Sequence, residues 1–335
     1  MLKVGILGSG FMGATHAEGW MHTAAQIVGL HSLDVERANL LVQQFDIPRR
    51  YDSYEALLND VDVVDVCTPT HLHYEHVLTA AAAGKHIICE KPLGLTVAQA
   101  QEMIAACQKA GVKLLVAHVV RFFPEYAAAK AVVERGEIGK VAVVRLTRAS
   151  FHPKATAENW FLDPTKSGGM MLDLMIHDFD YARWIAGEVE TVFAKSVRSR
   201  TPESPDDYGI AILKHTNGAL SNVEGGWAYP PPMFRTALEI AGSEGLIEHP
   251  AGSSQPLGVY LKKTDSGDSP DVGLPRSPML ESPYAVELRH FYEVLTDPAV
   301  TPRVTAEDGM KAVQIARAAL ESARLGREVK VAEVR

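Results

Sequence analysis

The sequence is poor in the features that mark exported and membrane-spanning proteins. It holds only three cysteines, Cys67, Cys89 and Cys107, which are odd in number and widely spaced. They fit neither a disulfide framework nor a zinc ribbon, so a reducing, cytoplasmic setting is expected. No apolar run approaches the roughly 18 residues that a membrane span needs. The chain also opens on a strand-like run without a charged leader, so we expect neither export nor a membrane partner.

Positive charge is scarce as well. The 33 lysines and arginines are outnumbered by 41 acidic residues, and no basic block collects on one segment. Nucleic acid is therefore not an expected partner. Hydrophobic residues make up 47% of the chain and charged residues 22%, which is typical of globular proteins. Because 335 residues exceed the size at which one core stops growing, we expect two domains, residues 1–120 and 121–335.

The first 120 residues alternate short apolar runs with longer helical stretches. Expected strands cover 2–7, 27–31, 63–67, 86–89 and 114–117. Between them, helices over 35–45 and 97–110 are expected to begin after the N-cap residues Asp34 and Thr96. This alternation predicts βαβ units, a parallel sheet and a Rossmann-type domain.

The second half has a different pattern of expected strands and helices. Strand-like runs follow one another at 141–148, 191–197, 210–214, 220–226 and 236–241. Strands without intervening helices predict a large, mostly antiparallel open sheet, so this half is an α+β domain within an α/β fold class overall. Helices are expected over 125–135, 170–185, 284–295 and 306–325. The stretch 250–283 is rich in Gly, Ser, Pro and Asp, and predicts a strand near 259–262 followed by a loop.

The first motif that carries chemistry is a glycine-rich turn between a strand and a helix. Residues 8–13 form G-x-G-x-x-G, in which Phe11 and Met12 precede the last glycine. Gly8 permits the tight turn, Gly10 allows close approach of a pyrophosphate, and Gly13 lets the helix pack closely on the strand. In this strand-turn-helix context the motif predicts a site for NAD or NADP.

The choice between NAD and NADP depends on the end of the second strand. An acidic residue is expected there to bind the ribose 2′-hydroxyl of NAD. Ser32 occupies this position instead, and Asp34 is assigned to the cap of the next helix. Serine does not repel a 2′-phosphate, and Arg37 lies one helical turn further on, so the sequence leaves both cofactors open.

Two more segments end strands of the same sheet, at the edge where ligands bind in this architecture. The expected cofactor contacts in them are Thr68, Pro69, His71, His73, Glu90 and Lys91. Lys91 is also a candidate catalytic group, because Pro92 fixes the chain after it. His71 and His73 are read as an H-x-H pair on a loop without a third ligand, so no metal site is expected.

The third segment with chemistry is a glycine-led helical stretch in the second half. Asp173 and His177 stand four residues apart there, on one face of the predicted helix. One interpretation is an intrahelical pair without chemistry. The other is a carboxylate and an imidazole that face the substrate.

Taken together, these segments resemble the Gfo/Idh/MocA oxidoreductase family, the group containing glucose-fructose oxidoreductase and inositol dehydrogenase. The resemblance rests on the 8–13 turn, the segment 68–71, Glu90-Lys91-Pro92, Arg121-Phe122 and the 173–177 helix, in the family's order and approximate spacing. It implies a two-domain NAD(P)-dependent enzyme with its active site in the cleft between domains. It also implies a homodimer or homotetramer formed through the open C-terminal sheet.

The family's usual reaction is oxidation of a secondary hydroxyl of a sugar, inositol or related polyol, or reduction of the matching ketone. By matching motif, the resemblance makes Lys91, Asp173 and His177 the catalytic set. We expect His177 to be the acid/base, Lys91 to stabilise the alkoxide and Asp173 to tune both, or Lys91 and His177 to exchange roles. The same three residues, with Arg121, His152, Asn159, Trp160 and Tyr284, are the candidate substrate contacts.

Two other functions fit the same fold. One is a non-enzymatic regulator that binds a dinucleotide, which the presence of the three catalytic candidates disfavours. The other is a reductase of a non-sugar carbonyl, as in the dihydrodiol dehydrogenase and biliverdin reductase branches, which would have an apolar cleft. The mixed polar and aromatic pocket candidates favour the polyhydroxy substrate.

Overall fold

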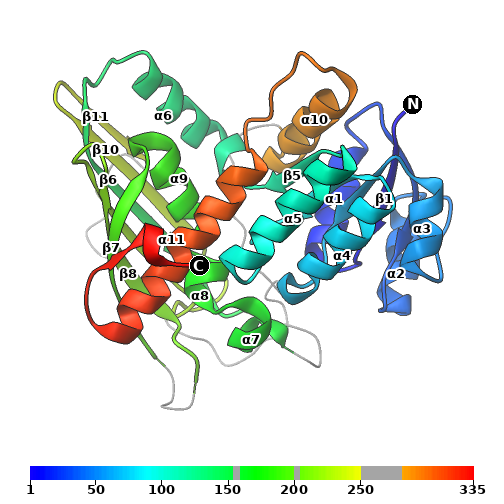
Figure 1. The fold of residues 1–335 in the computed structure, drawn as a ribbon, viewed down its shortest axis with the longest axis horizontal. Helices are drawn as coiled ribbons and strands as arrows, with labels where there is room; N and C mark the ends of the chain where they lie inside the picture. Colours follow the sequence, from blue (N-terminus) through cyan, green and yellow to red (C-terminus); the bar gives the residue numbers. More distant parts are fainter. Residues whose placement is uncertain (154–158, 200–203, 250–280) are drawn as a thin grey trace. The chain divides into compact units, whose positions relative to one another are not determined.

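The computed structural model describes residues 1–153, 159–199, 204–249 and 281–335, which form two compact units (Figure 1). The first unit comprises residues 1–123 and the described part of 277–310. The second comprises the described parts of 124–276 together with 311–335. The first unit therefore includes helix α10 (Pro283–Thr296), which comes from far along the chain. Within the described ranges, the structure contains no helix long and apolar enough to cross a membrane.

The first unit is built on a parallel sheet with the order β2-β1-β3-β4-β5. The strands are β1 (Lys3–Leu7), β2 (Gln26–His31), β3 (Val63–Val66), β4 (His86–Glu90) and β5 (Leu114–Ala117). Every residue of β3 and β5 is buried. Both faces of the sheet are covered, so its buried strands are apolar throughout, as in β5, or nearly so, as in β3. The predicted Rossmann-type sheet is confirmed, with each strand within one residue of its expected ends.

Helices connect these strands, and their starting points follow local capping rules. They are α1 (Phe11–Trp20), α2 (Val35–Gln44), α3 (Tyr54–Asp60), α4 (Thr70–Ala82), α5 (Val97–Ala110) and the 3-10 helix η1 (Val119–Phe122). The Asp34 carboxylate accepts a hydrogen bond from Arg37 N at 3.0 Å, and Thr96 Oγ1 accepts one from Gln99 N at 3.1 Å. Both predicted N-caps are thus confirmed.

The assignment of the H-x-H pair to a loop was wrong. His71 and His73 lie in the first turn of α4, which begins directly after Pro69. The extended backbone of Pro69 ends the preceding strand segment, and the alanine-rich sequence that follows favours a helix. In a helix, side chains two residues apart do not share a face, which further separates the two imidazoles.

The second unit contains a seven-stranded sheet with the order β11-β10-β6-β9-β8-β7-β12. Its strands are β6 (Val141–Ala149), β7 (Val189–Val197), β8 (Tyr208–His215), β9 (Leu220–Gly226), β10 (Arg235–Gly242), β11 (Leu246–His249) and β12 (Val329–Lys330). In the described sheet all neighbours are antiparallel apart from β6 and β9. The mostly antiparallel sheet is therefore confirmed. The strand expected at 259–262 lies outside the described residues.

The remaining helices belong wholly or in part to the second unit. They are α6 (Pro124–Glu134), η2 (Trp160–Leu162), α7 (Pro164–Ser167), α8 (Met170–Asp173), α9 (Ile176–Ala186), α11 (Ala306–Leu325) and η3 (Val331–Glu333). Helix α9 packs on β6 and β9. A Cβ on Gly209 would lie 2.7 Å from Met171 Cε, and one on Gly225 would lie 2.6 Å from Met175 Cγ. Glycine at these sheet positions lets the segment holding α8 and α9 approach closely.

The single helix predicted over 170–185 was wrong, because the segment divides into α8 and α9. Around Leu174 and Met175 the backbone pattern changes: Met175 N bonds Met170 O, five residues back, and Asp178 N bonds Met175 O, three residues back. The methionine and leucine side chains keep an apolar helical pattern through this change, so the sequence alone predicts one continuous helix. Packing against the sheet decides the break.

The two faces of this second sheet differ. In β8, Gly209, Ala211 and Leu213 are buried while Ile210 and Ile212 are exposed, and the same alternation runs through β7. Phe193 of β7 pairs with Ile212, so their exposed side chains are neighbours. One face is thus covered by helices, and the other presents apolar residues to the surface.

Candidate functional site

The glycine turn has the geometry that a pyrophosphate site requires. Gly8 has φ +113°, and a Cβ there would lie 2.6 Å from the carbonyl oxygen of Cys67. A Cβ on Gly13 would lie 2.2 Å from Gly8 O, so the start of α1 packs directly against the turn. At Gly10, among the described residues, nothing lies within 4 Å of the Cβ position. Gly10 therefore faces open space at the N-terminus of α1, where unpaired backbone N–H groups and the absence of acidic residues in the first turn favour an anion.

Ser32 directly follows β2, as predicted, and its hydroxyl faces the glycine turn. Ser9 Oγ donates to Ser32 Oγ at 2.8 Å, and Asp34 N donates to Ser32 Oγ at 3.2 Å. The Arg37 guanidinium is 43% exposed and its Nε lies 3.7 Å from Asp34 Oδ2. The edge thus presents a hydroxyl with an accessible cation nearby.

The segment after β4 carries Lys91, which is half-buried at the carboxyl edge of the sheet. Its backbone N–H donates to Glu90 Oε2 at 2.9 Å. Glu90 itself is buried, and its other carboxylate oxygen, Oε1, lies 3.1 Å from His16 Nε2.

His73 joins this segment to the end of β3. Its Nδ1 lies 2.8 Å from Pro92 O and its Nε2 lies 2.8 Å from Thr68 O. Burial lowers the pKa of His73, although these two carbonyl contacts oppose the shift. The imidazole therefore bridges two of the segments that the sequence assigned to the cofactor, from a buried position.

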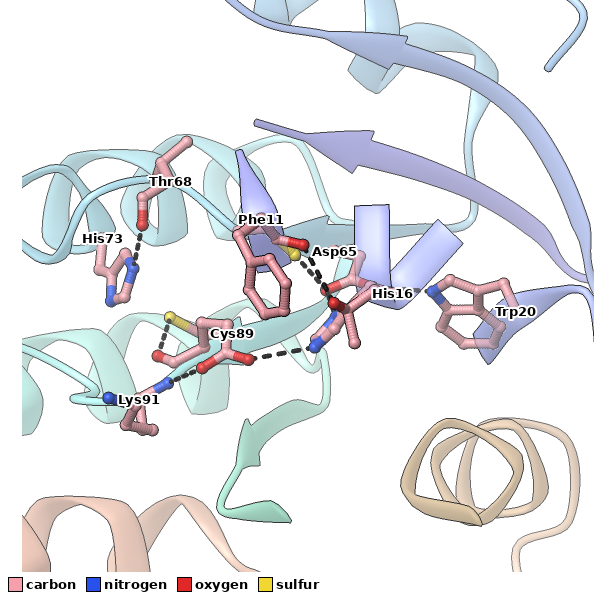
Figure 2. A network of polar contacts seen from close by, with 11 residues as sticks. Phe11, His16, Trp20, Asp65, Thr68, His73, Cys89 and Lys91 are labelled. Atoms are coloured by element: carbon pink, nitrogen blue, oxygen red, sulfur yellow. Dashed lines mark hydrogen bonds and ion pairs between the residues drawn. The ribbon is translucent and has the colours of Figure 1, made fainter. Parts of the chain in front are cut away.

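A buried polar network that the sequence analysis missed lies beneath these segments (Figure 2). His16 Nδ1 lies 3.0 and 2.9 Å from the two carboxylate oxygens of Asp65, and His16 Nε2 lies 3.1 Å from Glu90 Oε1. Trp20 Nε1 donates to Asp65 Oδ2 at 2.7 Å. The available signal was Asp65, a carboxylate within an otherwise apolar buried strand, since a buried charge requires a partner.

In the second unit, Asp173 is the last residue of α8 and His177 lies in the first turn of α9. Asp173 is buried and His177 is half-buried. Both belong to the segment that the glycines of β8 and β9 admit close to the sheet.

The residue after His177 anchors α9 to the sheet. The carboxylate of Asp178 accepts hydrogen bonds from Arg148 of β6 at 2.6 and 3.0 Å, and both side chains are buried. Burial raises the pKa of Asp178 above its ordinary value, and the Arg148 guanidinium opposes this shift. The bidentate contact fixes the start of α9 and with it the backbone of His177.

The other predicted substrate contacts are divided between the units. In the first unit, the buried Arg121 guanidinium donates to Arg303 O at 2.9 Å and lies 3.3 Å from Asp308. The ring of Tyr284 lies 6.5 Å from that of Phe123.

In the second unit, His152 Nε2 lies 3.2 Å from Asp207 Oδ2. Burial would raise the pKa of Asp207, but hydrogen bonds from Ser199 and His152 outweigh it and lower that pKa. Trp160 stacks on Phe161 with ring centroids 3.9 Å apart, and Asn159 donates to Pro153 O. The structure thus places Lys91, Arg121 and Tyr284 in one unit and His152, Asn159, Trp160, Asp173 and His177 in the other.

Comparison with known proteins decides the family. Residues 2–118 match the oxidoreductase family with an NAD-binding Rossmann fold, and residues 126–248 match the GFO/IDH/MocA C-terminal domain. The chain belongs to the Gfo/Idh/MocA oxidoreductase family. It is 31% identical to myo-inositol 2-dehydrogenase of Thermotoga maritima, with 99% of each chain covered. It is 28% identical to 1,5-anhydro-D-fructose reductase of Ensifer adhaerens, with 92% of each covered.

Among solved structures, the chain is similar to levoglucosan dehydrogenase in complex with NADH and levoglucosan. The TM-score is 0.82 at 26% identity, and the match covers 98% of this chain and 99% of that one. Membership in the Gfo/Idh/MocA family confirms the resemblance, the fold class and an NAD(P)-dependent oxidoreductase. The matched family binds NAD through this Rossmann fold, and the cofactor supplies the hydride chemistry when bound.

Proposed function

We propose that this protein transfers a hydride between NAD(P) and a secondary hydroxyl or ketone of a sugar, inositol or related polyol. The observation that carries the proposal is the Gly8–Gly13 turn, with Lys91 at the carboxyl edge of the same sheet. The names of the relatives support the substrate class, since they act on inositol, anhydrofructose and levoglucosan.

In this proposal the protein's residues handle the proton of the substrate hydroxyl. His177 accepts or returns that proton, Lys91 Nζ donates a hydrogen bond to the substrate oxygen and stabilises developing alkoxide, and Asp173 adjusts the charge of both. Exchange of the roles of Lys91 and His177 gives the same overall reaction. The anchoring of α9 through Asp178 supports His177 in this role, because a proton-transfer group needs a fixed position.

The end of β2 leaves the choice between NAD and NADP open. We propose that the site accepts NADP as well as NAD, because Ser32 brings no carboxylate to the expected ribose position and Arg37 is accessible. Asp34 is engaged in capping α2, which supports Ser32 as the residue that meets the ribose.

We also propose that the exposed face of the second sheet forms a homodimer or homotetramer interface. Phe193, Ile210 and Ile212 give this face an apolar surface of the kind that marks interaction sites. Light scattering should report a homo-oligomer for the parent and dissociation for Ile212→Lys. A parent that is monomeric at all concentrations would contradict the proposal. A cytoplasmic location is supported by Cys67, Cys89 and Cys107, which are all buried and free.

The test of the reaction is absorbance at 340 nm with NAD and NADP across a panel of sugars, inositols, sugar acids and aromatic diols. We expect turnover of a polyhydroxy substrate, and activity on the aromatic diols alone would favour the non-sugar reductase instead. Lys91→Ala and His177→Ala should each lower kcat by about 10²–10⁴-fold while nucleotide affinity is retained.

Lys109→Ala is the matched control for Lys91→Ala. Lys109 is exposed in the last turn of α5 and its removal makes the same change in charge. We expect parental activity from this control. Parental kcat in both Lys91→Ala and His177→Ala would show that neither residue takes part in the reaction.

A further inference from the structure

The buried network of His16, Asp65 and Glu90 connects the helix of the nucleotide turn with the backbone of Lys91 (Figure 2). His16 lies three residues after Gly13 in α1 and is completely buried. One carboxylate faces each of its ring nitrogens, and only a doubly protonated imidazole donates a hydrogen bond at both. With both carboxyl groups ionised, the contacts describe an imidazolium held between two carboxylates.

The groups around His16 agree with this charge. Burial is the largest single effect and lowers the pKa of His16, but the combined electrostatic and hydrogen-bond contributions of Asp65 and Cys67 outweigh it and raise that pKa well above the ordinary value. Burial raises the pKa of the neighbouring Cys67 thiol, which donates to Asp65 Oδ1 at 3.5 Å as a neutral group. From α10, Glu287 is also fully buried, and burial followed by the charges of Glu90 and Asp65 raises its pKa well above the ordinary value.

Glu90 transmits the position of His16 to Lys91. Its Oε1 meets the imidazolium and its Oε2 accepts the Lys91 backbone N–H. Removing either contact would free one end of the carboxylate. The Asp65 end is fixed separately, because Trp20 donates to the carboxylate that holds His16 Nδ1. The network is thus a continuous series of hydrogen bonds from α1 through β3 and β4 to the residue at the sheet edge.

We infer that His16 is a positioning residue for Lys91 and acts through Glu90. A contribution to stability alone explains the network poorly, because buried ion pairs replaced by apolar groups of similar volume are often neutral in stability. What the network supplies is a single position for the Lys91 backbone, set from the helix that begins at the nucleotide turn. The inference rests on the proposed role of Lys91 at the substrate oxygen.

The test combines His16→Phe and Glu90→Gln with Lys91→Ala in double-mutant cycles. His16→Phe replaces the ring by an apolar one, and Glu90→Gln keeps the side chain's shape without its charge. Each should lower kcat by about 10- to 100-fold, the effect of a misplacement near 1 Å. KM and nucleotide Kd should change less than kcat does. Because removing one member of a buried ion pair is destabilising, melting curves should show lowered midpoints for proteins that are still folded at the assay temperature.

In the Lys91→Ala background the same substitutions should cost little further activity, because the residue through which they act is gone. An equal loss in both backgrounds would overturn the inference and assign His16 a general structural role. Unchanged kcat in His16→Phe and Glu90→Gln, with a large loss in Lys91→Ala, would also overturn it while leaving the proposed function intact. Parental kcat in Lys91→Ala would instead contradict the role of Lys91 itself.

Glu287→Gln is the matched control. It changes a buried carboxyl near the same network, whose two oxygens have no hydrogen-bond partner among the described residues. We expect its kcat to match the parent.

Metal analysis of the purified protein completes the test, because His16, Asp65 and Cys67 bring potential ligand atoms within 4.8 Å of one another. We expect no bound metal. A stoichiometric divalent metal that is lost in His16→Phe would overturn the inference, since His16 would then be a ligand.

Discussion

The two sheets of this protein differ in where their charged side chains lie and in what those side chains contact. The parallel sheet of the first unit is covered on both faces, so Asp65 in β3 and Glu90 at the end of β4 place carboxylates inside the unit. The open sheet of the second unit separates charge by face: along β6, Arg148 is buried against Asp178, whereas Arg145 is exposed and pairs with Glu239. Charge inside the two-sided sheet is held in a network of side chains, whereas charge on the one-sided sheet is paired on the buried face and solvated on the exposed face.

Breaking the buried pair of the second sheet should have the largest effect on stability. Asp178→Asn removes the buried carboxylate that accepts two hydrogen bonds from the Arg148 guanidinium, so we expect a loss of about 3–5 kcal/mol in the free energy of unfolding. Urea denaturation measures it. Glu239→Gln, which breaks the ion pair on the exposed face, is the control and should leave the urea midpoint of unfolding unchanged.

The double variant Arg148→Met/Asp178→Leu sharpens this result. It removes both charges, so it should be more stable than Asp178→Asn. If Asp178→Asn unfolds at the same urea concentration as the parent, the pair does not hold α9 in place and the contrast between the two faces is wrong.

The first unit should show its buried charge in the dependence of stability on pH. The pKa of Glu287 is raised in the folded protein, so the folded state favours the neutral carboxyl. The stability that goes with this neutral form is fully present below the unfolded pKa of about 4.5 and is lost as the pH rises toward the folded pKa. Glu287→Gln removes this loss. The difference in free energy of unfolding, variant minus parent, should therefore increase by about 1.4 kcal/mol for each pH unit between the unfolded and the folded pKa of Glu287.

Urea denaturation of both proteins at several pH values between about 5 and 8 measures this gain. The contribution of His16, whose pKa is also raised, follows the same direction in both proteins: it is present below about 6.5 and is lost as the pH rises through the folded pKa. A difference between variant and parent that stays constant across this range would mean that Glu287 is ionised in the folded protein.

The smallest effect is expected at the exposed edge of the first sheet. Ser32→Asp introduces a carboxylate at the proposed ribose position, where it would repel a 2′-phosphate and accept a hydrogen bond from a ribose hydroxyl. We expect the ratio of kcat/KM for NAD to that for NADP to rise by about tenfold or more, equivalent to about 1.4 kcal/mol. Steady-state kinetics with both cofactors measures it, and Arg37→Ala should weaken NADP more than NAD. A ratio that does not change would place the ribose away from Ser32.

Much of the fold follows from local patterns. Apolar runs and turn residues predicted both sheets, and the caps at Asp34 and Thr96 were recognisable because a side chain and a backbone N–H three residues apart form them. The break between α8 and α9 was not recognisable, since the apolar pattern continues through Leu174 and the close approach to the sheet depends on Gly209 and Gly225, distant in sequence.

The candidate site divides in the same way. The sequence by itself determined the glycine turn of residues 8–13, because the conformation and packing of Gly8, Gly10 and Gly13 are local to one strand-turn-helix unit. It also determined the position of Lys91 at a strand end. Only the tertiary structure decided that His16 and Asp65 meet Glu90, since residues 49 to 74 positions apart come together through strand order and helix packing. The sequence shows that a buried charge needs a partner but does not show which residue it is, because the fold decides which side chains come together.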